Sequence, residues 1–157
     1  MKQKKSQLKD DESTLRALHL RYLAKRDYTC RELMNICEEK GFAQNLIHDQ
    51  LQQLMATGYI NEKRFASNFT RNKKARGFGP KAIAFALNLR GISDDIIAEN
   101  TKISDNSWLV EMKRLLVKRF KNDLSDPKVR VKAMRFLLNK GFTRTQVFLV
   151  LKEDDTE

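Results

Sequence analysis

The tripeptide Lys40-Gly41-Phe42 (KGF) recurs as Arg90-Gly91-Ile92 (RGI) and again as Lys140-Gly141-Phe142 (KGF), so that the three glycines stand 50 residues apart. The chain has only six glycines and two prolines in 157 residues. A basic residue, a glycine and an apolar residue in succession are typical of a helix end, because glycine adopts the left-handed backbone conformation without steric cost. The regular spacing therefore predicts three copies of one structural module.

Apolar residues around each glycine repeat with the same period. Upstream pairs at i, i+4 spacing and single downstream positions match in all three copies: Leu33/Cys37, Ile83/Leu87 and Ala133/Leu137, then Ile47, Ile97 and Val147. Each copy indicates three helices. We expect an all-α fold, an elongated tandem array of three three-helix modules. Their predicted bounds are 13–59, 60–103 and 104–152, between a disordered basic arm at 1–12 and an acidic tail at 153–157.

Local signals mark where individual helices begin. The stretch Thr29-Cys30-Arg31-Glu32 predicts a capping box, and Asn61 suits the N-cap of the next module's first helix. Ser125-Asp126-Pro127 predicts a helix start in module three, since proline is tolerated in the first turn. The first helix of that module is expected to bury one stripe of side chains: Trp108, Leu109, Met112, Leu116 and Phe120.

The stretch Arg76-Gly77-Phe78-Gly79-Pro80-Lys81 (RGFGPK) concentrates helix breakers between basic residues. Gly77 and Gly79 are expected to end one helix and turn the chain, and Pro80 to begin the next. The stretch thus predicts a tight corner between two helices. It is not a phosphate-binding loop, because the G-x-x-x-x-G-K pattern and a preceding strand are both absent from the sequence.

The charge balance points to a polyanionic partner. The chain has 31 Lys plus Arg against 20 Asp plus Glu, a net charge of +11, which favours nucleic acid, anionic lipid or an acidic protein surface. No apolar run is long enough to span a bilayer, and the lysine-rich start lacks the hydrophobic segment of a secretory signal. Cys30 and Cys37 are too far apart along a helix for a disulfide. We therefore expect a cytoplasmic protein without a membrane partner.

Basic residues gather in two blocks free of acids, residues 63–93 and 127–152. Helical spacing aligns Arg64, Arg71 and Lys74 on one helix face, and Arg114, Lys118 and Lys121 on another. A solvated face usually mixes both signs of charge, so we expect these blocks to bind a filament or nucleic acid. The candidate binding residues are Arg64, Arg71, Lys73, Lys74, Arg76, Lys81, Arg90, Arg114, Lys118 and Lys121.

Two other classes of function fit less well. A helix-turn-helix transcription factor would read bases with the second helix of a pair. Of the two candidate reading helices, 43–57 is nearly uncharged and 94–100 is acidic, so neither suits a groove lined with phosphates. Catalysis finds little support, since His19 and His48 are isolated and no Cys/His cluster has metal-ligand spacing. The sequence predicts no enzyme, no metal and no cofactor.

The middle module resembles the signature of RecX, the family of bacterial regulators of the RecA recombinase. The residues that carry the resemblance are Gly58-Tyr59-Ile60-Asn61-Glu62-Lys63-Arg64-Phe65-Ala66, Phe69, Arg71, Arg76-Gly77-Phe78-Gly79-Pro80, Ile83, Leu87 and Arg90-Gly91-Ile92. The resemblance covers residues 14–151, and the family's tandem three-helix repeats agree with the predicted layout.

The resemblance implies a non-enzymatic, monomeric inhibitor that binds the RecA filament on single-stranded DNA. It would dampen strand exchange, ATP hydrolysis and the filament-stimulated repressor cleavage of the SOS response, and so regulate homologous recombination and DNA repair. Binding to double-stranded DNA stays open, as do filament-end capping and groove binding. The alternative from the residues themselves is a general DNA- or RNA-binding protein that contacts phosphates without a recombinase partner.

Overall fold

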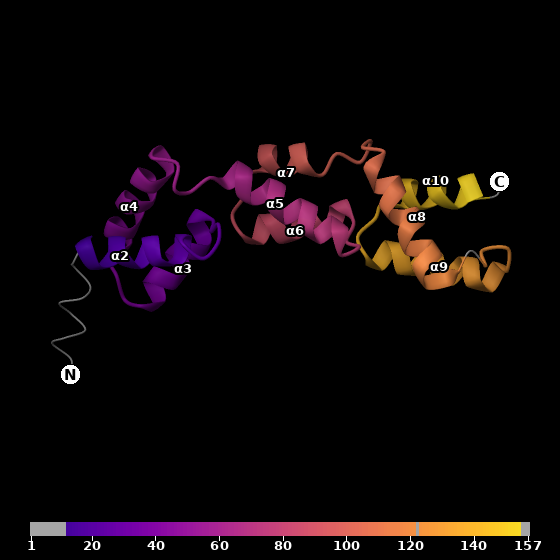
Figure 1. The fold of residues 1–157 in the computed structure, drawn as a ribbon, viewed down its shortest axis with the longest axis horizontal. Helices are drawn as coiled ribbons and strands as arrows, with labels where there is room; N and C mark the ends of the chain where they lie inside the picture. The colour runs from indigo at the N-terminus through magenta and orange to yellow at the C-terminus, as the bar shows by residue number, and fades with distance from the viewer. Residues whose placement is uncertain (1–11, 122, 155–157) are drawn as a thin grey trace. The chain divides into compact units, whose positions relative to one another are not determined.

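The computed structural model describes residues 12–121 and 123–154, and these residues form helices and no strand (Figure 1). The helices are α2 (Glu12–Leu23), α3 (Cys30–Glu39), α4 (Gln44–Ala56), α5 (Glu62–Ala75), α6 (Pro80–Leu89), α7 (Asp94–Asn100), α8 (Ser107–Phe120), α9 (Pro127–Asn139) and α10 (Arg144–Asp154). The all-α class with a helical repeat is confirmed.

The predicted arm and tail fall largely outside the described residues. Residues 1–11 and 155–157 are not described, whereas Glu12 begins α2 and Glu153 belongs to α10. None of the described helices is long and apolar enough to cross a membrane.

The chain divides into two compact units, and the division falls inside α5. Unit 1 comprises Met1–Ala66 with Arg90–Ile92, and unit 2 comprises Ser67–Leu89 with Ser93–Glu157. This division does not follow the borders expected from the repeat, so the module bounds 13–59, 60–103 and 104–152 stay a prediction.

The three repeat glycines end their helices in the left-handed conformation, with φ of 89° at Gly41, 79° at Gly91 and 97° at Gly141. The amide of Phe42 donates to the carbonyl of Cys37 over 3.2 Å, and the amide of Phe142 donates to that of Leu137 over the same distance. These bonds satisfy carbonyls that a helix end leaves open. The following apolar residue is buried in each copy, which explains the basic-Gly-apolar pattern.

Unit 1 packs α2, α3 and α4 around a core that includes Leu15, Leu33, Ile47 and Leu51. The predicted capping box is confirmed: Thr29 Oγ1 accepts from the Glu32 amide, and the Thr29 amide donates to the Glu32 carboxylate over 3.0 Å. The Cys30 amide, next in the chain, donates to Glu62 Oε1 over 3.1 Å. The first turn of α3 therefore has its donors satisfied from two sides.

A polar group lies inside this core. His19 is fully buried, its Nδ1 lies 3.1 Å from Gln50 Oε1, and its Nε2 lies 3.3 Å from Cys37 Sγ. Gln50 also donates to the Glu12 carbonyl over 2.7 Å. Burial lowers the pKa of His19, and the hydrogen bond with Gln50 opposes that effect in part. The imidazole is thus a packing group held neutral, as expected for an isolated histidine.

In unit 2, the corner at RGFGPK makes a backbone contact that the sequence did not predict. The Gly79 amide donates to the Lys140 carbonyl over 2.7 Å, and the Lys81 amide donates to the Gly141 carbonyl over 2.9 Å. A Cβ at Gly79 would lie 2.4 Å from backbone atoms of Gly141 and Phe142. Gly77 has φ of 92° and ends α5 as predicted, but Gly79 serves close approach between two backbones.

The core of unit 2 includes Trp108, whose ring meets Phe142 edge to face with centroids 6.4 Å apart. Its indole nitrogen donates to the Lys102 carbonyl over 2.9 Å. Of the predicted stripe on α8, Trp108, Met112 and Leu116 are buried, Leu109 and Phe120 are half-buried, and Leu115 is buried without having been predicted.

The start of α9 follows the prediction for Ser125-Asp126-Pro127. Asp126 is the N-cap, its Oδ1 accepts from the Lys128 amide over 2.9 Å, and Pro127 occupies the first turn. At the start of α9, the free Lys128 amide is therefore satisfied by the side chain of the N-cap residue. At the start of α6, the Lys81 amide instead donates to the Gly141 carbonyl.

Replacement of His19 by Gln should reduce the acid sensitivity of unit 1. Because burial lowers the folded-state pKa of His19, the unfolded chain binds the proton first, so stability falls as pH drops below the unfolded value of about 6.5. The loss approaches at most about 1.4 kcal/mol per pH unit and ends at the folded-state pKa. Thermal unfolding at pH 7.5 and 5.5 measures it; the exposed His48, changed to Gln, is the control, and equal pH sensitivity in His19→Gln and wild type would contradict the assignment.

Gly79→Ala should destabilise unit 2 by at least about 2 kcal/mol, because the added methyl group displaces a backbone and breaks two hydrogen bonds. Gly58→Ala is the matched control: Gly58 has φ of +81° but no described atom within 4 Å of its added Cβ, so only conformational strain of about 1 kcal/mol is expected. Denaturant unfolding gives the energies, and amide exchange at Gly79 and Lys81 localises the change. A smaller loss for Gly79→Ala than for Gly58→Ala would refute the close-approach role.

Candidate nucleic-acid interface

The ten predicted binding residues are distributed over both units. Unit 1 contains Arg64 and Arg90, and unit 2 contains the other eight. By position they fall on α5, the corner after it, α6 and the turn that follows, and α8 with its C-cap: Arg64, Arg71, Lys73 and Lys74; Arg76; Lys81 and Arg90; Arg114, Lys118 and Lys121.

The Arg64 side chain forms an ion pair with Asp27 within unit 1. Its Nη2 lies 2.7 Å from Asp27 Oδ1, and its Nε donates to Asp27 Oδ2 over 2.9 Å. These hydrogen bonds from Arg64 hold the pKa of Asp27 below its usual range. The bidentate geometry, more than the charge of two partly exposed groups, gives this pair its orientation. Arg64 therefore ties the first turn of α5 to the loop before α3.

Arg114 stands 50 residues after Arg64, at the equivalent position of the repeat. Its Nη2 donates to the Ala75 carbonyl over 3.1 Å, and its Nε donates to Glu111 over 2.8 Å. Arg90 also meets a carboxylate, because its Nε lies 3.6 Å from Glu32 Oε1. Three of the ten candidates thus bind other parts of the protein.

The predicted face of α5 is divided in the same way. Lys74 lies with its Nζ 4.0 Å from the centroid of Trp108 and donates to Ser107 Oγ. Arg71 is exposed and donates to Asn68 Oδ1 over 2.6 Å. Spacing alone placed Arg64, Arg71 and Lys74 together, but their partners differ because tertiary neighbours differ along the helix.

The ring of Phe78 gathers three cations. Lys73 Nζ and Lys140 Nζ each lie 5.1 Å from its centroid, and the Arg76 guanidinium carbon lies 6.0 Å from it. We call Lys73, Arg76, Lys140 and the ring of Phe78 the Phe78 cluster. None of the ion pairs within the described residues involves its three cations.

The fold fixes the Phe78 cluster through the corner and the repeat turn. Phe78 follows Gly77, and its amide donates to the Lys73 carbonyl over 3.0 Å. Lys140 precedes Gly141, and its own carbonyl accepts from Gly79. The backbone contact between these two turns therefore brings a lysine 60 or more residues away in sequence beside Lys73 and Arg76.

A second aromatic ring extends this basic region. Arg119 lies 4.8 Å and Lys140 lies 5.8 Å from the centroid of Phe136, which itself meets Phe120 edge to face at 5.8 Å. Ring faces attract cations, but like charges held this close repel one another. An anion that contacts several of these groups relieves the repulsion, and phosphate groups have this chemistry.

Lys140 and Arg119 were not among the predicted binding residues. The signal for Lys140 was present, since it is the basic residue of the third repeat tripeptide and follows the aromatic Phe136 by four positions. Lys81, Lys118 and Lys121 are exposed, and in the described part of the chain no cation-ring contact joins them to the Phe78 cluster.

Groups for metal or thiolate chemistry do not gather at this site. Within residues 12–121 and 123–154, no three His, Cys, Asp or Glu side chains are placed to hold a metal ion. Burial raises the pKa of the Cys37 thiol to about 11, and burial with the nearby Glu62 does the same for Cys30. Both thiols are therefore protonated at neutral pH.

The chain is similar to known proteins along most of its length. The family profile described as RecX, second three-helix domain, matches residues 61–99. Regulatory protein RecX from Halorhodospira halophila (strain DSM 244 / SL1) is 34% identical over 129 residues, 82% of this chain and 80% of that protein. Regulatory protein RecX from Legionella pneumophila (strain Corby) is 33% identical over 136 residues, 85% of this chain and 90% of that protein.

Solved structures show the same fold. The crystal structure of RecX from Lactobacillus salivarius has a TM-score of 0.81 and 23% identity, and the alignment covers 94% of this chain and 99% of that one. A second crystal structure, of a regulatory protein RecX, has a TM-score of 0.77, 21% identity and coverage of 90% and 73%. With one-third identity to named relatives over more than four-fifths of its length, the chain belongs to the RecX family.

Proposed function

We propose that this protein is a non-enzymatic inhibitor of the RecA recombinase that binds the RecA filament on single-stranded DNA. The observation that carries the proposal is membership of the RecX family, whose curated members are named regulatory proteins. The family implies RecA as partner, and the Phe78 cluster supplies a surface suited to a nucleoprotein filament. In this proposal the protein acts in the cytoplasm as a monomer.

The mechanism follows from the chemistry of the cluster. Lys73, Arg76 and Lys140 donate to phosphates or acidic side chains along the filament, and the ring of Phe78 lies near the charged groups of all three. A bound regulator that spans DNA and recombinase resists the movements of RecA that accompany ATP hydrolysis and strand exchange. Repressor cleavage on the filament, and with it SOS induction, falls for the same reason.

The second candidate is a general nucleic-acid-binding protein. It is favoured by the net charge of +11 and by the two blocks, residues 63–93 and 127–152, that contain many basic residues and no Asp or Glu. Binding through phosphates alone weakens steeply with salt. The logarithm of the binding constant falls with the logarithm of the salt concentration, with a slope of roughly −0.7 for each phosphate contacted on a single strand. A mixed interface with protein loses less affinity over the same salt range.

The first experiment compares inhibition with DNA binding. RecA ATP hydrolysis on single-stranded DNA is titrated with this protein, and binding to the same DNA without RecA is measured in the same buffer. We expect inhibition well below one protein per RecA and weak binding to bare DNA. Inhibition only at concentrations that coat the DNA would reject the RecA assignment and favour the second candidate.

The triple variant Lys73→Ala, Arg76→Ala, Lys140→Ala tests the site. Loss of three charge-assisted contacts is expected to weaken inhibition by roughly a hundredfold or more, with helicity unchanged by circular dichroism. A control variant, Arg16→Ala, Arg21→Ala, Lys25→Ala, removes the same charge from exposed positions of unit 1 and should change inhibition by less than about threefold, as expected for screened surface charges. Equal effects of the two triple variants would mean that net charge, not the Phe78 cluster, governs binding.

A further inference from the structure

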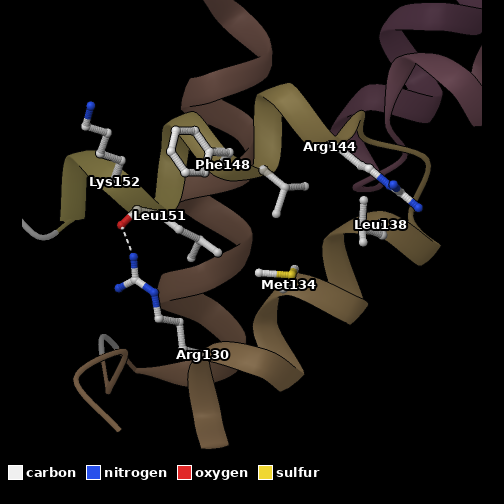
Figure 2. Close-up of a pocket in the computed structure, with 8 residues that line it drawn as sticks. Arg130, Met134, Leu138, Arg144, Phe148, Leu151 and Lys152 are labelled. Atoms are coloured by element: carbon white, nitrogen blue, oxygen red, sulfur yellow. Dashed lines mark hydrogen bonds between the residues drawn. The ribbon is translucent and has the colours of Figure 1, made fainter. Parts of the chain in front are cut away.

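A groove of about 710 Å³ lies in unit 2 between α9 and α10 (Figure 2), and none of the described residues that line it belongs to the Phe78 cluster. One stripe of α9 lines it at i, i+4 and i+8, with Arg130, Met134 and Leu138. A stripe of α10 with the same spacing, Arg144, Phe148 and Lys152, lines the other side. Stripes of this length extend about 12 Å along each helix.

The middle of the groove is apolar and open to solvent. Phe148 is 65% exposed and Met134 is 42% exposed, although both are large apolar side chains. On the opposite side of α10, Val150 is buried in the core, whereas Val147 and Leu151 are buried and also line the groove. The helix α10 is therefore apolar on two sides, and the core accounts for only one of them. An exposed apolar surface of this kind marks a site of interaction.

Positive charge stands at both ends of the groove. Arg130 and Lys152 lie near one end, where Arg130 Nη2 donates to the Leu151 carbonyl over 2.8 Å and so joins the start of α9 to the last turn of α10. Arg144 lies toward the other end (Figure 2). No Asp or Glu is among the described residues that line it. The charge pattern along the groove is thus positive, apolar, positive.

We propose that this groove binds a short amphipathic helix of an acidic partner protein. The occupant has charges of opposite sign to those of the groove, with carboxylates at both of its ends. Between them, two or three apolar side chains lie on one helix face, at positions i, i+3 or i+4, and i+7. Phe148 and Met134 contact the apolar face, and Arg144 and Lys152 meet the carboxylates. This is the recognition of a helix in a groove, read by its anchors.

Charge argues against two occupants that the chain itself could supply. A second copy carries a net charge of +11, which disfavours its approach to a basic groove. The first nine residues hold four lysines and no acid, so that segment lacks the carboxylates that the groove requires. A nucleic acid satisfies the charges and offers bases that stack on Phe148, but it leaves Met134 and Leu138 without apolar cover. The proposal is therefore independent of the DNA surface and of RecA inhibition.

Fluorescence anisotropy with a labelled synthetic peptide tests the proposal, without RecA or DNA. The probe is a helix-forming peptide of fourteen residues with two glutamates at each end and Leu, Phe and Leu at helical spacing; a scrambled peptide of equal composition is its control. Phe148→Ala should weaken probe binding roughly tenfold, as expected when a large apolar contact is lost. Phe85→Ala is the matched variant, since Phe85 is 67% exposed on α6, and should change binding less than about twofold.

The charged ends are tested by Arg144→Glu with Lys152→Glu, which should abolish binding of the probe. Three outcomes would overturn the proposal: equal binding of the scrambled peptide, equal loss in Phe85→Ala and Phe148→Ala, or displacement of the probe by an oligothymidylate or by anionic vesicles in a manner that depends on Phe148. Sedimentation velocity provides a further check, because a dimer that Phe148→Ala dissolves would assign the groove to a second copy.

Discussion

The close approach of two turns, at Gly79 and at Gly141, is the contact on which unit 2 depends. Two backbone hydrogen bonds cross it, from the Gly79 and Lys81 amides to the carbonyls of Lys140 and Gly141. Backbones can meet at this distance only where no Cβ intervenes. The glycine that ends a helix in the repeat is therefore also the surface against which the preceding corner packs. Glycine serves both demands, which explains why this residue type stands at both 79 and 141.

The same contact determines the electrostatics of the candidate site. Because Lys140 lies directly before Gly141, docking of the turn brings its charge to the ring of Phe78, where Lys73 and Arg76 already lie. The backbone contact and the ring contacts hold the three cations close together in spite of their mutual repulsion, and a bound anion would reduce that repulsion. In the proposed function, the stability of the junction and the affinity for a polyanion are therefore linked through a few neighbouring residues.

Sequence reasoning predicted the parts of the fold that depend on local chemistry. The repeat glycines, the Thr29 capping box, the Asn61 cap at 2.9 Å from the Arg64 amide and the proline starts of α6 and α9 all follow from residues within one or two turns of each other. The unit division inside α5 did not follow, because it reflects packing between distant segments. The role of Gly79 was also missed, since close approach has no local signature apart from the glycine itself.

The candidate site shows the same limit. Spacing placed Arg64 and Arg114 on basic faces, but the structure gives each a protein acceptor, Asp27 for one and the Ala75 carbonyl for the other. Which of many cations pair internally depends on long-range neighbours, which a pattern of charges does not encode. Arg64 and Arg114 stand one repeat apart, so the period itself was the available hint that they share a structural role.

The cap at Asp126 has a consequence for assembly. At the start of α3, the Cys30 amide donates to the Glu62 carboxylate. At the start of α6, the Gly79 and Lys81 amides donate to carbonyls of the turn at Gly141. At α9 the residue before the proline is an aspartate that already accepts the Lys128 amide. A turn of another molecule would meet a side chain where the Gly79 corner has only hydrogen, and would find the amide occupied. Asp126 thus fills at α9 the position that Gly79 leaves open at α6, so the start of α9 lacks the space for a second turn that the start of α6 provides.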